Sequence, residues 1–203
     1  MGKLQVKQDV FNNLGLGAGI ITTAEPTVDS TTNEVTINDA DILGATRGGG
    51  TFNPNPQVRS RSIDGLAANT VQIHAVDRYE PTLSATFITA SLEVLLKGVG
   101  FGDISAEDVL TARHEVKATD YETIYFVESM SDGGVKIYEL DNAICTAGAA
   151  VKTNNEGETE IPLTFVGNYT INDQDTPPFK ITRVTPVTPT PEPTPTPTEN
   201  AQE

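Results

Sequence analysis

Residues 121–140 read YETIYFVESMSDGGVKIYEL and carry a clear signal about the fold. Two runs rich in β-branched and aromatic residues, 121–130 and 135–140, flank the turn-forming tetrapeptide SDGG. Alternating strand-like runs on either side of a glycine-rich turn predict a β-hairpin. Apolar residues fall on both faces of these strands, so we expect both faces to be covered by other parts of the chain.

Strand patterns also occur before and after this hairpin. Residues 83–89 (LSATFIT) and 159–165 (TEIPLTF) alternate apolar and polar side chains, so each should present one apolar face to a core. Pro162 lies inside the second pattern and cannot donate a hydrogen bond to a neighbouring strand. We therefore expect it at an edge, at a bulge or at the start of a strand.

One helix is predicted just after residues 83–89. Ser91 can cap its N-terminus, and Gly98 or Gly100 can end it. The apolar stripe that should lie on a sheet follows helical spacing: Leu92, Leu95, Leu96 and Val99. A second, short helical turn is predicted over 105–112, because Ser105 and Asp108 have the spacing of a capping box.

The stretch 44–65, GATRGGGTFNPNPQVRSRSIDG, has strand-like ends around a centre rich in Gly and Pro, which predicts a long projecting loop or loose hairpin. Its arginines form the main basic patch of an acidic chain. Such a loop suits head-to-tail stacking of like subunits, because loop and acceptor carry opposite charges. The alternative is an ordinary solvated loop. The candidate stacking residues are Arg47, Gly49, Phe52, Pro54, Pro56, Arg59 and Arg61.

The expected fold is mainly β: two packed antiparallel sheets, resembling a sandwich or barrel, with one flanking α-helix and the projecting loop. Residues 1–183 form the expected β domain. Residues 184–203 alternate Pro and Thr, a composition that favours solvated polyproline II over packing, so we expect a disordered tail outside the domain.

Charge and composition exclude several classes of protein. The 203 residues contain 13 Lys and Arg against 28 Asp and Glu, a formal net charge of −15, which argues against a general nucleic-acid binder. Cys145 is the sole cysteine, so no disulfide can form within the chain. No run of 18 apolar residues or signal-peptide core occurs, and folding in a cytoplasm is expected.

No catalytic, cofactor or metal motif is found in the sequence. The glycines match no nucleotide-binding pattern, and His74, His114 and Cys145 lie far apart along the chain. Asp173 and Asp175 match only a fragment of a calcium loop, and a turn is the favoured interpretation. We therefore expect neither an enzyme nor a cofactor-dependent protein.

An ordered set of segments resembles the tail tube (major tail) proteins of long-tailed bacteriophages. Within residues 43–181 these segments are LGATRGGGTFNP, RSIDG, LSATFITASLEVLLKG, DYETIYFVES with its DGG turn, YELDNAICT, ETEIPLTFVGNY and PPFKI. The resemblance depends on their order and spacing, since each segment alone is a strand with a turn. The Pro-Thr tail departs from the family pattern.

The resemblance implies a structural virion protein. It implies six copies per ring, rings stacked through a long loop at about 46–61, and inner strands joined into one continuous sheet around a lumen. Leu92, Leu95 and Leu96 would pack behind the sheet or between subunits. Assembly would take place in the bacterial host cytoplasm with other tail proteins (tip initiator, tape measure and terminator), without a membrane. DNA would pass through the acidic lumen without specific binding.

Two alternatives remain open from the residues. A Pro-Thr segment is also typical of stalks that carry extracellular modules, so the chain could be a surface β-sandwich adhesion or carbohydrate-binding module. The inner tube of a contractile injection device would share the chemistry of assembly and would differ by its sheath partner.

Overall fold

The hairpin predicted at 121–140 forms the centre of the fold. Strand β11 (Glu122–Ser129) pairs antiparallel with β12 (Val135–Cys145). In the turn between them, the Asp132 carboxylate accepts a hydrogen bond from the Gly134 amide at 2.9 Å, and Gly133 takes a φ of 79° that glycine adopts without strain. The turn predicted from SDGG is confirmed, because Asp132 supplies a hydrogen bond within it and Gly133 supplies the positive φ that it requires.

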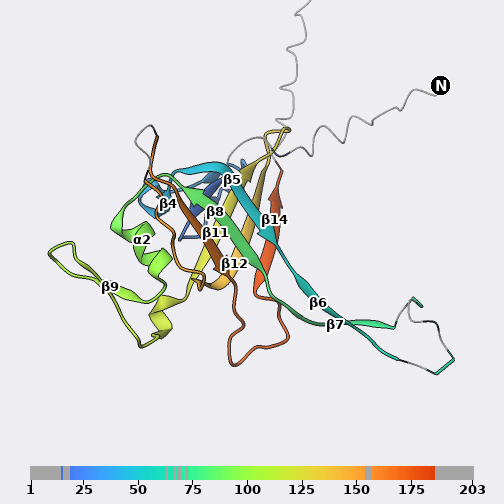
Figure 1. Ribbon diagram of the computed structural model, residues 1–203. Helices are drawn as coiled ribbons and strands as arrows, with labels where there is room; N and C mark the ends of the chain where they lie inside the picture. Colours follow the sequence, from blue (N-terminus) through green and yellow to red (C-terminus); the bar gives the residue numbers. More distant parts are fainter. Residues whose placement is uncertain are drawn as a thin grey trace, which may run out of the picture.

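The computed structural model describes residues 15, 19–62, 64–65, 67, 70–71, 73–153 and 157–185. These residues form a mainly β protein whose strands pair antiparallel throughout, as expected (Figure 1). The central sheet follows the order β4-β1-β11-β12-β13-β8-β5, and β14 pairs with β12. Its other strands are β1 (Ile20–Thr22), β4 (Ile42–Gly44), β5 (Thr46–Asn53), β8 (Thr82–Phe87), β13 (Ile161–Val166) and β14 (Phe179–Val184).

Strand β12 is long enough to belong to two layers. Its first part, 135–140, pairs with β11 and β14, whereas its last residues, Ile144 and Cys145, pair with β13. Between the two parts, Asn142 has a φ of 46°. A residue of this kind interrupts the ladder and bends the strand. The bend lets β13, β8 and β5 form a second layer packed against β1, β4, β11 and β14.

The main core lies between the two layers. The two alternating patterns are confirmed, because Leu83 and Phe87 of β8 and Leu163 and Phe165 of β13 are buried while their polar neighbours point away. Pro162 faces Thr86, and the pairing of β13 with β12 is confined to Phe165 and Val166, so the proline lies beyond that ladder. The other buried members of this core are Ile21, Leu43, Ala85, Val94, Ile124, Phe126, Leu140, Ala143, Cys145 and Ile161.

A second, smaller apolar cluster covers the other face of the β11–β12–β14 layer. Tyr125, Val127, Ile137 and Val184 are buried there beneath Val35 and Ile37. The covering segment is the short hairpin β2 (Thr27–Val28) and β3 (Val35–Thr36), followed by the 3-10 turn η1 (Asp39–Asp41). Both faces of the central hairpin are therefore covered, as its sequence predicts.

Helix α2 (Leu92–Val99) has the predicted bounds. The Ser91 hydroxyl accepts a hydrogen bond from the Val94 amide, and Gly100 ends the helix with a φ of 82°. The buried face differs from the predicted stripe, however. Val94 is completely buried together with Gly98, whereas Val99 is 42% exposed. Val94 belongs to the main core, and a side chain at Gly98 would meet Ala149 and Leu163, so this face of the helix is the one that lies against the sheet.

The helical turn predicted at 105–112 is wrong. The chain forms a hairpin there, β9 (Gly102–Ile104) with β10 (Leu110–Ala112), and a 3-10 turn, η2 (Ala118–Asp120), follows it. Ser105 does act as a cap, but it caps a loop: its hydroxyl accepts hydrogen bonds from the amides of Glu107 and Val109. Asp108 takes a φ of 57°, which turns the chain back before a helix can start.

The long projection is a two-stranded ribbon. Strand β6 (Pro56–Ser60) pairs antiparallel with β7 (His74–Tyr79), and the ribbon leaves the body on the side opposite the β9–β10 hairpin (Figure 1). It starts later than the sequence predicts, because 46–53 forms β5 within the main sheet. Most of the predicted Pro-Thr tail, from residue 186 on, lies outside the described residues. Among the described residues, no helix is long and apolar enough to cross a membrane.

Candidate assembly surfaces

The β6–β7 ribbon exposes an apolar pair. Val58 and Val76 face each other across the two strands, and 53% of Val58 and 49% of Val76 are open to solvent. Val71, farther along the projection, is 83% exposed. A two-stranded hairpin is only marginally stable in water unless something covers one of its faces. The ribbon therefore presents an apolar surface on an extended element that the body does not cover.

The base of the ribbon is held firmly on the body. The backbone amide of Tyr79 donates a hydrogen bond to the Tyr169 hydroxyl at 2.8 Å, and the Tyr79 ring packs edge-on against Phe179 with centroids 5.4 Å apart. The Glu80 amide donates to the carbonyl of Asn55, which lies between Pro54 and Pro56. Pro54 and Pro56 thus stand at the junction of body and ribbon, where a missing amide donor costs least.

Three of the predicted stacking residues lie in the body and not in the projection. Arg47, Gly49 and Phe52 belong to β5, which pairs with β8. The glycines at 48 and 49 have positive φ angles and form a bulge in this pairing, so they shape the sheet edge instead of freeing a loop. The Phe52 ring packs against the main core, with its centroid 5.3 Å from that of the tilted Tyr138 ring.

The predicted basic patch is largely neutralised by neighbouring carboxylates. Arg47 forms ion pairs with Glu158 and, at 3.0 Å, with Glu160. Arg59 pairs with Asp77 across the ribbon at 3.1 Å. Within the described residues, no ion pair of Arg61 is found. The sequence pattern could not reveal this neutralisation, because each partner is distant along the chain and is brought close by strand pairing.

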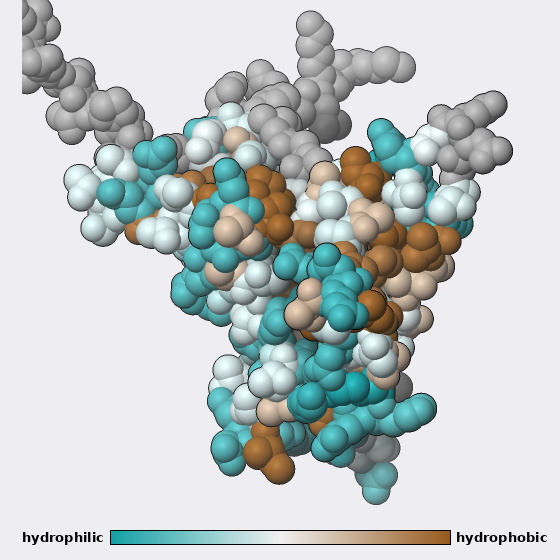
Figure 2. Space-filling model, turned by 90° about the vertical axis from the view of Figure 1, so that its left-hand side faces the viewer, coloured by the Kyte–Doolittle hydropathy of each residue, from teal (hydrophilic) through white to brown (hydrophobic). Residues whose placement is uncertain are grey.

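The helix residues singled out from the sequence are half-buried. Leu95 packs against the main core, and Leu92 and Leu96 are partly open on the flank of the helix. Contacts join α2 to β9 and β10, so the helix and the β9–β10 hairpin lie on the same side of the molecule. Figure 2 views this side and shows hydrophobic patches between hydrophilic ones.

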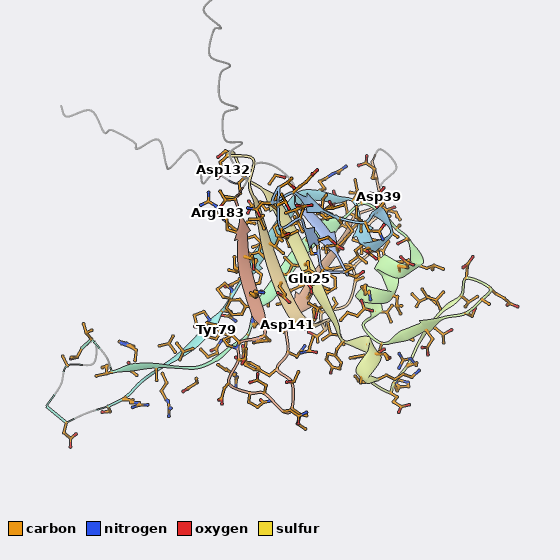
Figure 3. The ribbon with its side chains drawn as sticks, turned by 180° about the vertical axis from the view of Figure 1, so that it is seen from behind. Glu25, Asp39, Tyr79, Asp132, Asp141 and Arg183 are labelled. Atoms are coloured by element: carbon orange, nitrogen blue, oxygen red, sulfur yellow. The ribbon has the colours of Figure 1, made fainter. Side chains whose placement is uncertain are left out.

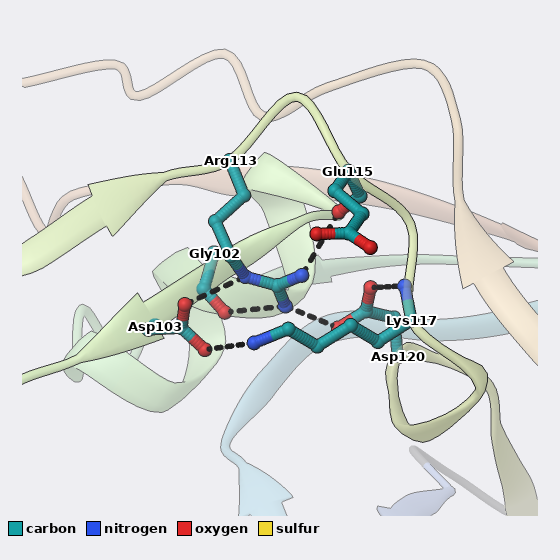
Figure 4. A network of polar contacts seen from close by, with 6 residues as sticks. All are labelled: Gly102, Asp103, Arg113, Glu115, Lys117 and Asp120. Atoms are coloured by element: carbon teal, nitrogen blue, oxygen red, sulfur yellow. Dashed lines mark hydrogen bonds and ion pairs between the residues drawn. The ribbon is translucent and has the colours of Figure 1, made fainter.

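A polar network holds the β9–β10 hairpin to the turn η2 (Figure 4). Its centre is the Arg113 side chain, which is 16% exposed. The guanidinium contacts the Asp103 carboxylate at 2.7 Å, the Asp120 carboxylate at 2.6 Å, the Gly102 carbonyl at 3.1 Å and the Glu115 carbonyl at 2.9 Å. This network was not predicted from the sequence. The feature that could have indicated it is an arginine that directly follows a strand and has five acidic residues nearby in the sequence.

The same network shifts the pKa of Asp120. Burial disfavours the charged carboxylate, but the Lys117 backbone amide at 2.7 Å and the Arg113 guanidinium outweigh burial and lower the pKa below its ordinary value. Asp120 therefore stays ionised, and the hairpin is fixed by charge-assisted hydrogen bonds.

A row of ionisable groups crosses the other side of the molecule. Tyr125, Glu139 and Lys180 are neighbours on β11, β12 and β14. Asp141 follows two residues after Glu139 and is labelled, together with Glu25, in Figure 3. Burial, followed by the charges of Glu139 and of Glu25 on the covering loop, raises the pKa of Tyr125 to about 12. Burial also raises the pKa values of Glu139 and Asp141, so these carboxylates are held in an unfavourable environment.

The described residues offer no cluster that could hold a metal ion. His74 lies on the ribbon, His114 lies after β10, and Cys145 is buried at the end of β12. Asp173 accepts hydrogen bonds from the amides of Asp175 and Thr176, which confirms a turn at that position.

Neither the family models nor the curated proteins include a match to this chain. The features of the molecule that bear on function are the two projecting hairpins and the acidic charge of the body.

Proposed function

We propose that this protein is the tail tube subunit of a long-tailed bacteriophage, a structural virion protein that assembles into stacked hexameric rings around a channel for DNA. The ring number and the phage origin come from the resemblance of residues 43–181 to that family. The geometry adds a reason for assembly that is independent of the resemblance.

The observation that carries the proposal is the uncovered β6–β7 ribbon. Its apolar pair, Val58 and Val76, stands on an element anchored rigidly at Tyr79 and otherwise surrounded by solvent. An extended ribbon of this kind gains stability when a second protein surface covers it. In a tube made of one protein, that surface is another copy of the same chain.

The charge of the body suits a channel for DNA. Residues 1–183 carry 25 of the 28 acidic residues and all 13 basic ones, a formal net charge of −12. This charge repeated around a ring would repel phosphates within about a Debye length, ~8 Å at physiological salt. The genome would then slide through without binding. No cofactor and no catalytic step is required for this function, and the tip initiator, tape measure and terminator of the tail would be its partners.

The first experiment is negative-stain electron microscopy of the purified protein at rising concentration. We expect rings or hollow tubes for the natural sequence. A variant in which an Asn-Gly turn joins Gln57 to Arg78, replacing 58–77, should fold and remain monomeric, because it keeps the sheet strand β5 but removes the outer ribbon with its apolar pair. Tubes formed by this shortened variant would contradict the proposal.

Two matched point variants distinguish a specific role of the ribbon in assembly from a general effect of adding charge to the surface. Val58→Asp should prevent tube formation, whereas Ile171→Asp should not, although Ile171 is 90% exposed. Both changes lie on the surface and should alter the free energy of unfolding by no more than ~0.5 kcal/mol. Equal loss of assembly in the two variants would indicate a non-specific effect of added charge.

The competing functions predict other results. A surface adhesion or carbohydrate-binding module should stay monomeric at all concentrations and bind glycans on an array. An inner tube of a contractile device should also form tubes, and those tubes should additionally bind a sheath protein, which cosedimentation with tail lysates of contractile phages would detect.

A further inference from the structure

The molecule carries two hairpins that leave the body on opposite sides. The β6–β7 ribbon projects on one side, and the β9–β10 hairpin, next to α2, projects on the other (Figures 1 and 3). A contact between unlike surfaces at opposite ends of a subunit repeats from copy to copy without turning back on itself. This placement is what a head-to-tail stack of identical subunits requires.

The two ends match in their apolar residues. At the β9–β10 end, Val99 closes α2, Val109 lies in the hairpin loop and Val116 follows β10; each is between 42% and 52% exposed. At the ribbon end, Val58 and Val76 are exposed to a similar degree. Exposed aliphatic side chains at both ends would be removed from water by one contact.

The two ends also differ in charge. Residues 102–120 contain five carboxylates and two cations, a net charge of −3. Arg113 and Lys117 are already occupied by Asp103 and Asp120, and the described residues provide no ion pair for Glu107 or Asp108 in the hairpin loop. On the ribbon, Arg59 is occupied by Asp77, but Arg61 is not paired within the described residues.

We infer that the β9–β10 hairpin and the adjoining end of α2 are the docking surface for the β6–β7 ribbon of a second copy of this chain. Val58, Val71 and Val76 would cover the exposed valines, with Val71 beside Val109, and Arg61 would lie against Glu107 and Asp108. The Arg113 network would keep the hairpin in the shape that receives the ribbon. This inference rests on the proposed tube function and names the acceptor surface that the function leaves open.

Disulfide cross-linking between copies tests the contact directly. Val71→Cys and Val109→Cys are made in separate chains, which are mixed, assembled and oxidised mildly; wild type, in which Cys145 is buried, gives the background. We expect a cross-linked dimer from the mixture and only background from either variant alone. The control mixture of Val71→Cys with Ile171→Cys should also remain at background.

A charge exchange gives a second, independent test. Arg61→Glu should raise the concentration needed for assembly at least tenfold at low salt, and Glu107→Arg in the same chain should reverse most of that loss. Lys152→Glu is the control, because it reverses the charge of an exposed cation outside both hairpins and should leave the assembly concentration unchanged.

The outcomes separate the two proposals. Tubes that form without the Val71–Val109 cross-link, or with a dimer from Val71→Cys alone, would overturn the docking surface and leave the tube function standing. If the protein forms neither tubes nor cross-links at any concentration, both proposals fail. A cross-link together with rescue by Glu107→Arg supports both.

Discussion

Asn142 and Asn168 exchange hydrogen bonds: the side-chain amide of each residue donates to the backbone carbonyl of the other, at 3.0 Å and 2.8 Å. Asn142 stands where β12 bends from one layer into the other, and Asn168 lies just after β13. The pair therefore holds the corner of the sandwich. Asparagine suits the position, because it tolerates a φ of 46° and offers both a donor and an acceptor.

The corner can be tested with two substitutions at Asn142. Asn142→Ala loses the amide and places a methyl-bearing residue at a positive φ, so we expect a loss of ~2 kcal/mol in the free energy of unfolding. Asn142→Gly loses the hydrogen bond but keeps the backbone geometry, and should cost ~1 kcal/mol. Urea denaturation measures both. Equal costs would show that the backbone angle contributes nothing.

Two valines on α2 test which face of the helix is buried. Val94→Ala should lower the free energy of unfolding by ~2 kcal/mol, because Val94 is fully buried. Val99→Ala should change it by less than ~0.5 kcal/mol, because Val99 is largely open. The pair is matched in residue type, helix and propensity. A larger effect at Val99 would favour the stripe predicted from sequence.

The Arg113 network predicts a local effect on the β9–β10 hairpin. In Arg113→Met, the Asp120 carboxylate loses its guanidinium, so amide hydrogen exchange should accelerate at 102–112 while the β11 and β12 amides keep their rates. In the natural protein the protection factors of the same amides, which correct for slower intrinsic exchange at low pH, should fall on acidification. The lowered pKa of Asp120 contributes stability that is present above about pH 4 and is lost as pH falls through the folded-state value. Unchanged exchange in the variant would contradict this role.

The carboxylates on the outer face predict the opposite dependence on pH. Burial raises the pKa of Asp141, so the folded state binds its proton more readily than the unfolded state does. The associated stability is present below about pH 4 and is lost as pH rises through the raised value. Asp141→Asn should therefore stabilise the protein at pH 7 by less than about 1 kcal/mol, because the group is partly solvated, and have no effect at pH 3.5. Asp175→Asn serves as the control, since urea midpoints for that variant should match wild type at both values.

The fold class and several elements were predictable because they depend on neighbouring residues. Alternation placed Leu83, Phe87, Leu163 and Phe165 in the core, and a serine cap with a terminal glycine gave α2 its bounds. The hairpin at 121–140 follows from its turn chemistry alone. The same local reasoning failed at Ser105, because a residue that can cap a helix can also cap a loop, and the positive φ at Asp108 decided between them.

The sequence by itself determined a mainly β, acidic chain with an element that projects near residue 60, since periodicity, turn residues and charge are properties of local order along the chain. Only the tertiary structure decided that 46–53 belongs to the sheet, that Arg47 and Arg59 are neutralised, and that Val94 is buried in place of Val99. It also brought the β9–β10 hairpin to the side opposite the ribbon. These facts depend on strand pairing between residues distant in sequence, which brings together groups that no local pattern relates.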